Sequence, residues 1–250
     1  MAESTIFDDV FRTETEKMPE LTIPLINEVF GTNYPSNVEI IQGRNEHLTK
    51  SGKKITDSYI IIGEKRYHME CQSTEDSTMI LRMIEYDFAI SVEYAEKVHG
   101  VYRMQFPHSC ILYLRGDVRE KTVSMELQFP DNQVVQYKVP VIRIEWYSIK
   151  EILEKDLIML LPFYIMRYEK MKQQLENDEV LREKLFQEYE MIAKYLEQND
   201  KVAYVNYCGL ENDKYHALAE KYLPNGSCGV VSFGVKGGRK AAEEFMKHLK

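Results

Sequence analysis

Two short runs rich in apolar residues lie between residues 57 and 72, on either side of a short polar turn. β-Branched and aromatic residues cluster before and after Gly63-Glu64-Lys65, a pattern typical of two strands joined by a tight turn. We therefore expect strands over residues 57–62 and 67–72. The turn is expected to be centred between Glu64 and Lys65.

The expected hairpin brings three polar side chains together. With that turn, Asp57 faces Gln72, and Glu70 shares their face because side chains alternate with a period of two. Two carboxylates and a carboxamide suit a hard cation, since Mg²⁺ prefers oxygen ligands and could activate water for phosphodiester cleavage. The alternative is that all three are solvated residues on the open face of an ordinary hairpin. The spacing alone leaves both interpretations open.

The rest of the first 198 residues predicts a mixed series of helices and strands. Apolar residues recur every three or four positions in some stretches and alternate in others. We expect helices over residues 7–30, with a break near Met18-Pro19, over 78–98, from the Ser148 capping box to Pro162, and from there to about residue 196. We expect strands over residues 38–42, 108–114, 122–129 and 134–142, and a polar loop over 43–52. The expected core stripe of the 78–98 helix is Ile80, Met83, Ile84, Phe88, Val92 and Ala95.

The hairpin resembles the active-site region of the PD-(D/E)XK nuclease superfamily, in its transposase-like, recombination-promoting branch. That superfamily has an Asp at the start of one strand and Glu-x-Lys on the next. Asp57 and Glu70-Cys71-Gln72 match this pattern, with Gln in place of Lys. The similarity extends through residues 7–12, 24–30 and 82–87 and covers roughly residues 5 to 198. It implies an α/β fold with a mixed-sheet, restriction-endonuclease-like core.

The resemblance also implies roles for the hairpin residues. Asp57 and Glu70 would hold Mg²⁺ or Mn²⁺, with the backbone carbonyl of Cys71 as a further ligand. Gln72 would orient the attacking water as a neutral dipole, without the positive charge of the usual lysine. DNA would be the substrate and partner.

Three residues outside the hairpin are further candidates for this site. Asp8 matches the Asp-x-x-Phe-Lys/Arg element of the same branch and is the candidate accessory acid. The alternative for Asp8 is a helix N-terminal acid favoured by the helix dipole. Glu46 and His47 could supply an acid or a base from the polar loop, or could simply be solvated there.

Composition narrows the class of protein. The chain has 250 residues, 44% of them hydrophobic, a formal net charge of −8 and four cysteines without CxxC spacing. The cysteine spacing argues against a zinc site or a disulfide framework and favours a reduced, cytoplasmic setting. No membrane span or signal peptide is expected. The negative charge argues mildly against a broad DNA-coating surface.

Glycines become frequent after Asn199-Asp200, which indicates a domain boundary. Residues 205–211, 221–226 and 232–239 resemble the start of the C-terminal domain of O-acetylhomoserine sulfhydrylases, a branch of the pyridoxal-phosphate-dependent transsulfuration enzymes. No lysine here matches that family's Schiff-base motif, and Lys236 lies in a glycine-rich segment. We therefore expect a fused fragment for which pyridoxal phosphate is unlikely as a cofactor.

These observations predict three parts: a nuclease-like core over residues 1–147, a helical extension over 148–198 and a small α/β fragment over 199–250. The leading hypothesis is a metal-dependent DNA endonuclease of the transposase-associated family. One rival is a pyridoxal-phosphate-dependent, sulfhydrylase-related protein, defined by its C-terminal fragment. A second rival is a non-catalytic DNA-binding or protein-binding module that keeps the nuclease fold.

Overall fold

The computed structural model describes residues 6–49, 52–116, 119–164, 168, 171–223, 226 and 229–248. The chain divides into two compact units, Met1–Trp146 and Tyr147–Lys250. Each unit has its own secondary structure and its own core. Every helix within the described ranges is too short or too polar to cross a membrane.

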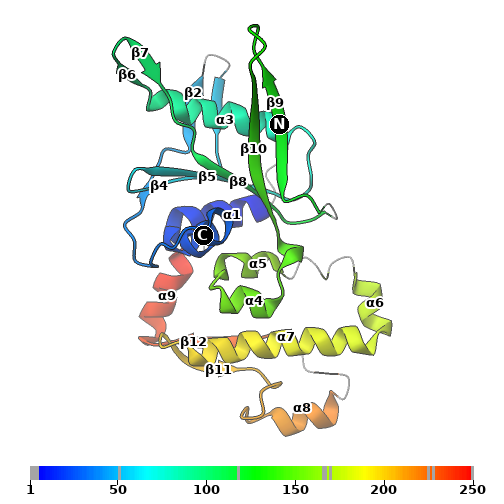
Figure 1. Cartoon of the computed structure of the whole chain (residues 1–250). Coiled ribbons are helices and arrows are strands. Elements are labelled where there is room, and N and C mark those ends of the chain that lie inside the picture. Colours follow the sequence, from blue (N-terminus) through cyan, green and yellow to red (C-terminus); the bar gives the residue numbers. More distant parts are fainter. Residues whose placement is uncertain are drawn as a thin grey trace. The chain divides into compact units, whose positions relative to one another are not determined.

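The first unit is built on a six-stranded mixed sheet (Figure 1). The strand order is β1-β4-β5-β8-β10-β9, with parallel pairs in the middle and antiparallel pairs toward both edges. The bounds are β1 Ile41–Gln42, β4 Ser58–Ile62, β5 Lys65–Gln72, β8 His108–Tyr113, β9 Thr122–Gln128 and β10 Val134–Arg143. The expected mixed α/β class is confirmed, whereas the restriction-endonuclease-like core is not.

Helices cover both faces of this sheet, with α3 on one side and α1 and α2 on the other (Figure 1). The helical segments are α1 Ile6–Lys17, η1 Pro19–Leu21, α2 Thr22–Phe30, α3 Met79–Glu93 and η2 Ile144–Trp146. The predicted break at Met18-Pro19 is confirmed, since proline suits the start of a helical segment and disrupts its interior. Met79 and Met83 of α3 pack on Ile111, Val139 and Val141 of the sheet.

The buried face of α3 differs from the apolar stripe expected for it. Phe88 and Val92 are 50% and 48% exposed, whereas Tyr86, Asp87 and Ile90 are buried. Asp87 accepts hydrogen bonds from buried groups on the sheet, so the helix turns this polar residue inward. A stripe defined by hydrophobicity alone leaves Asp87 out.

Two short hairpins replace segments expected to be loop or helix. β2 Glu46–Thr49 pairs with β3 Gly52–Ile55 in the stretch expected to be a polar loop. β6 Glu96–Val98 pairs with β7 Val101–Arg103, so α3 ends earlier than expected. The turn between β6 and β7 is His99-Gly100, with φ of 49° and 86°. Positive φ at both residues is what a two-residue type I′ turn requires.

The central hairpin forms, but its register differs from the expectation by two residues. Ile62 pairs with Lys65 and Ile60 with Tyr67, which leaves Gly63-Glu64 as the turn. Gly63 has a φ of 58°, and a glycine at the first position of a two-residue turn matches the type II′ hairpin. This shorter turn brings Asp57 opposite Glu70 instead of opposite Gln72.

In its described residues, the second unit contains helices and one two-stranded sheet. Its elements are α4 Ile149–Glu154, η3 Ile158–Leu160, α5 Leu161–Tyr164, α6 Lys172–Asn177, α7 Glu179–Gln198, β11 Val202–Asn206, α8 His216–Tyr222, β12 Ser232–Val235 and α9 Gly238–His248. The predicted Ser148 capping box is confirmed. The helix that it opens ends early, however, and Asp156 adopts a φ of 56° before the chain reaches Pro162.

A small core joins α7 to the segment that follows it. Ala193 packs with Tyr207 and Leu210, all nearly fully buried. β11 and β12 pair in antiparallel register. The three-part domain division with a boundary at residue 199 stays a prediction.

Candidate functional site

Asp57, which directly precedes β4, lies beside Glu70, which is near the end of β5. The backbone N–H of Asp57 donates to Glu70 Oε1 at 3.0 Å, and the N–H of Cys71 donates to Asp57 Oδ2 at 3.0 Å. Arg12 Nη2 of α1 donates to the other oxygen, Asp57 Oδ1, at 3.1 Å. The structure thus brings these two carboxylates together, although their own chain already supplies donors to both.

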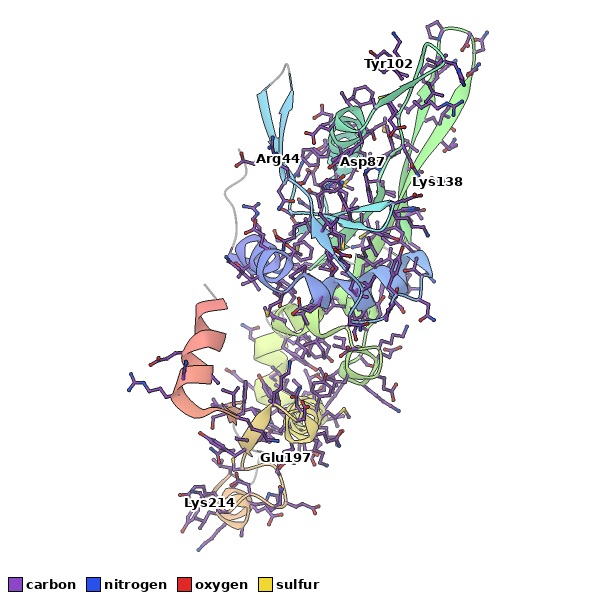
Figure 2. All side chains as sticks on the ribbon, turned by 90° about the vertical axis from the view of Figure 1, so that its left-hand side faces the viewer. Arg44, Asp87, Tyr102, Lys138, Glu197 and Lys214 are labelled. Atoms are coloured by element: carbon purple, nitrogen blue, oxygen red, sulfur yellow. The ribbon has the colours of Figure 1, made fainter. Side chains whose placement is uncertain are left out.

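His68 links Glu70 to a second buried carboxylate. Its Nε2 lies 2.9 Å from Glu70 Oε1, and its Nδ1 lies 2.7 Å from Asp87 Oδ1. Ser109 Oγ and Tyr137 Oη also donate to Asp87, at 2.7 and 2.5 Å. In Figure 2, Asp87 lies where α3 faces the sheet. The result is a continuous polar network inside the first unit.

The network holds His68 in its charged form. Burial alone lowers the pKa of His68, but the hydrogen bonds and charges of Asp87 and Glu70 outweigh it and raise that pKa to about 10. With both ring nitrogens facing carboxylates, the imidazolium donates on both sides. His68 is therefore a buried cation between two anions.

Asp57 holds its proton more tightly than an exposed aspartate. Burial and the negative charge of Glu70 raise its pKa to about 7, while the hydrogen bonds from Cys71 and Arg12 act in the opposite direction. An acid with a pKa near neutrality is chemically able to give or take a proton. A catalytic role for Asp57, Glu70 and Gln72 nevertheless stays a prediction.

Gln72 and the Cys71 carbonyl, two further parts of the expected metal site, bind each other. Gln72 Nε2 donates to the backbone oxygen of Cys71 at 2.8 Å, and Arg82 Nη1 donates to Gln72 Oε1 at 3.3 Å. In the described part of the chain, no group of three or more His, Cys, Asp or Glu residues is arranged to hold a metal ion. The oxygens expected to ligate a cation accept N–H donors of the protein itself.

The remaining candidates lie apart from these contacts or outside the described side chains. Asp8 falls in α1 and His47 in β2, but neither side chain is among those the structure describes. Glu46 is exposed at the start of β2. His68 and Asp87 were not among the predicted site residues. The available signal for His68 was its position two residues before Glu70, which places both side chains on one face of a strand.

The pKa of His68 predicts that the first unit loses stability above neutral pH. Folded His68 keeps its proton up to about pH 10, whereas an unfolded histidine releases it near 6.5. Between these values the folded state binds more protons, so raising the pH favours unfolding. We expect the free energy of unfolding to fall from pH 7 to pH 9. Unfolding can be monitored by the fluorescence of Trp146, the single tryptophan.

A matched variant isolates the source of this slope. His68→Gln removes the titrating ring, so its free energy of unfolding is expected to fall less between pH 7 and pH 9. The remaining fall comes from Glu14, whose pKa burial raises to about 8. The exposed His99→Gln, in the turn between β6 and β7, is the control and keeps the original slope. An unchanged slope in His68→Gln would show that other groups cause it.

The second unit offers a different surface. A cavity of about 510 Å³ lies against β12 and the start of α9, with Tyr204, Phe233 and Arg239 in its lining. The Arg239 side chain is 92% exposed and pairs with Glu243 one turn along. Gly237 and Gly238 adopt φ of 96° and 64°, so the glycine-rich segment forms the turn from β12 into α9.

A family comparison matches part of this second unit. Residues 181–250 match the family model of Cys/Met metabolism PLP-dependent enzymes. A homocysteine synthase from Schizosaccharomyces pombe is 44% identical over 78 residues, which are 31% of this chain and 18% of that enzyme. An O-acetyl-L-homoserine sulfhydrylase from Thermus thermophilus is 41% identical over 59 residues, 24% of this chain and 14% of the enzyme.

A relative with lower identity also matches over a short part of its length. A cystathionine gamma-lyase from Mus musculus is 38% identical over 76 residues, 30% of this chain and 19% of that enzyme. No solved structure matches. The C-terminal segment resembles PLP-dependent enzymes of Cys/Met metabolism. The chain spans less than a fifth of the length of each of these relatives.

These matches correct the leading hypothesis from the sequence. They point to enzymes of cysteine and methionine metabolism, and nothing in them supports a nuclease. The expected DNA endonuclease, with its DNA partner and its link to recombination, is therefore wrong. The expected cofactor, Mg²⁺ or Mn²⁺, is also wrong, and so is the expectation that pyridoxal phosphate is unlikely, because the matching family is PLP-dependent. The predicted sulfhydrylase resemblance of the tail is confirmed.

Proposed function

We propose that this chain works in cysteine and methionine metabolism, as a relative of the PLP-dependent sulfhydrylases, on a small-molecule substrate. The observation that carries the proposal is the 44% identity to a homocysteine synthase over 78 residues, together with the family match over residues 181–250. The matched residues form most of α7, both strands β11 and β12, and the small core of Ala193, Tyr207 and Leu210.

The cofactor of this family requires a lysine to which it can bind. When bound, pyridoxal phosphate serves as an electron sink and is held through a Schiff base to a lysine. Such a lysine reacts as a neutral amine, so enzymes enclose it where burial lowers its pKa. Every lysine whose side chain the structure describes is exposed. Lys194 also has its pKa raised by a hydrogen bond to Glu190.

The described lysines therefore do not fit the Schiff-base role. The described residues alone do not make a complete cofactor site. The proposal accordingly rests on the identity of residues 181–250, and the attachment point of the cofactor has to be found by chemistry.

The test treats the full chain with pyridoxal phosphate, reduces it with borohydride and locates the label by mass spectrometry. We expect one lysine, outside the exposed set, to carry close to one equivalent of label. We also expect homocysteine to form from O-acetylhomoserine and sulfide only with the cofactor present. Lys236→Arg, which changes an exposed lysine, is the matched control and should label equally. Scattered labelling without homocysteine formation would refute the proposal.

A further inference from the structure

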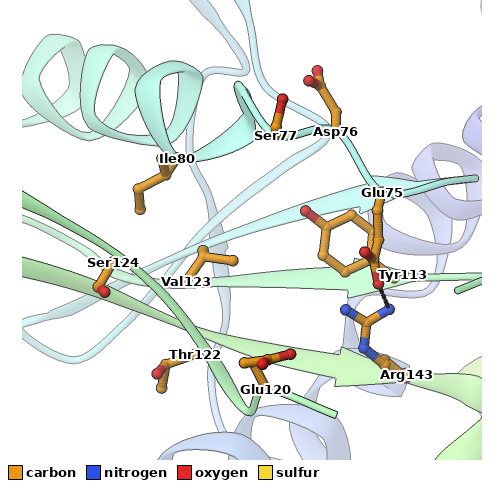
Figure 3. Close-up of a pocket in the computed structure, with 10 residues that line it drawn as sticks. All are labelled: Glu75, Asp76, Ser77, Ile80, Tyr113, Glu120, Thr122, Val123, Ser124 and Arg143. Carbon is orange, nitrogen blue, oxygen red and sulfur yellow. Dashed lines mark ion pairs between the residues drawn. The ribbon is translucent and has the colours of Figure 1, made fainter. Parts of the chain in front are cut away.

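A cavity in the first unit shares no lining residue with the network around His68. It has a volume of about 580 Å³, within the range of small-ligand sites. Figure 3 shows its lining: Glu75, Asp76, Ser77, Ile80, Tyr113, Glu120, Thr122, Val123, Ser124 and Arg143. These residues come from the segment before α3, from α3 itself, from β8, and from β9 and β10 with the segment before β9.

Arg143 is the buried cation of this cavity. Its side chain is 2% exposed, and its guanidinium lies 4.9 Å from the centre of the Tyr113 ring. Nη1 lies 2.5 Å from Glu75 Oε1, but neither Nε nor Nη1 has an acceptor in hydrogen-bonding geometry within the described residues. A buried guanidinium with unused donors is costly. A carboxylate on a ligand would satisfy them, because the guanidinium has five N–H donors and can serve two anions.

The other charged groups of the cavity are negative. Glu75 offsets Arg143, and Asp76 lies 3.8 Å from Nη1 of Arg82, which leaves the carboxylate of Glu120. Hydrogen bonds from Thr78 keep the pKa of Asp76 below its ordinary value, so it stays ionised. In Figure 3 the Glu120 side chain points toward Arg143. A ligand that satisfies both ends therefore carries an ammonium group close to a carboxylate.

Apolar groups complete the lining. Ile80 of α3 and Val123 of β9 lie within it, and the Tyr113 ring of β8 lies beside the charged end (Figure 3). These surfaces offer contact to an uncharged side chain and no partner for another charge. We propose that this cavity binds a free α-amino acid with an uncharged side chain, its carboxylate on Arg143 and its ammonium group on Glu120. This site is separate from residues 181–250 and does not depend on the function proposed for them.

The test is calorimetric titration of the full chain with L-leucine and L-methionine, and with two analogues of leucine. Leucinamide lacks the carboxylate, and 4-methylpentanoic acid lacks the ammonium group. We expect at least one amino acid to bind. We expect each analogue of leucine to bind about tenfold or more weakly than leucine itself, since each loses one charge-assisted hydrogen-bonding group.

A pair of variants tests the assigned contacts. Glu120→Gln should weaken binding of the amino acid about tenfold and leave 4-methylpentanoic acid unaffected, because that acid has no ammonium group. Glu126→Gln, an exposed change on β9 outside the cavity, should leave both unchanged. Glu120 is itself exposed, so its variant is expected to fold. The proposal would be overturned if neither amino acid binds, or if leucinamide binds as tightly as leucine.

Discussion

Asp87→Asn is expected to destabilise the first unit by about 3–5 kcal/mol, the range for breaking one side of a buried ion pair. Asp87 faces the charged His68 and accepts from Ser109 and Tyr137. The amide keeps the shape of the side chain but removes the negative charge, and its NH₂ group faces these donors. The buried imidazolium would then keep Glu70 as its one carboxylate partner among the described residues.

The measurement is urea unfolding followed by Trp146, which lies in the first unit. Asp131→Asn, in the exposed turn between β9 and β10, is the matched control and should change stability by no more than about 0.5 kcal/mol. Combining Asp87→Asn with His68→Gln should cost less than the sum of the two, because the pair is coupled. Equal costs for Asp87→Asn and Asp131→Asn would refute the charged network.

Ile90→Ala is expected to cost about 2–5 kcal/mol, the usual range for removing a fully buried aliphatic side chain. Ile90 is 0% exposed on the inner face of α3, whereas Phe88, two positions earlier, is 50% exposed. Phe88→Ala removes more atoms, yet it should cost less than about 1 kcal/mol because half of the ring already contacts water.

Trp146 fluorescence in urea again gives the two free energies of unfolding. Both substitutions introduce the same alanine into the same helix, so helix propensity contributes almost equally to them. The comparison therefore isolates burial. A larger cost for Phe88→Ala than for Ile90→Ala would show that α3 buries the stripe expected from the sequence.

Local patterns were sufficient for elements whose signals lie within a few residues. The break at Pro19, the Ser148 capping box and the hairpin of β9 and β10 all follow from steric or hydrogen-bonding rules that act over three or four positions. The hairpin of β4 and β5 was predicted as an element, but its register was not. A two-residue turn and a longer one suit the same residues, and a shift in turn position changes every pair.

Longer-range interactions decided the rest. The helix face of α3 depends on Asp87, whose partners His68, Ser109 and Tyr137 lie 19, 22 and 50 residues away. The expected metal site depends on whether its carboxylate oxygens are free of hydrogen bonds. The N–H groups of Asp57 and Cys71 donate to these oxygens only once β4 and β5 pair. Hydrophobicity and local spacing do not show which distant groups become such partners.

The sequence alone determined the class of the fold, most of its helices and strands, and the sulfhydrylase-like character of the tail, because propensity, capping and sequence identity are properties of short segments. The tertiary structure decided which polar residues are buried and what they bind. It placed His68 between two carboxylates and Arg143 beside Glu75. Burial and pairing arise only when distant strands and helices exclude water from the same space.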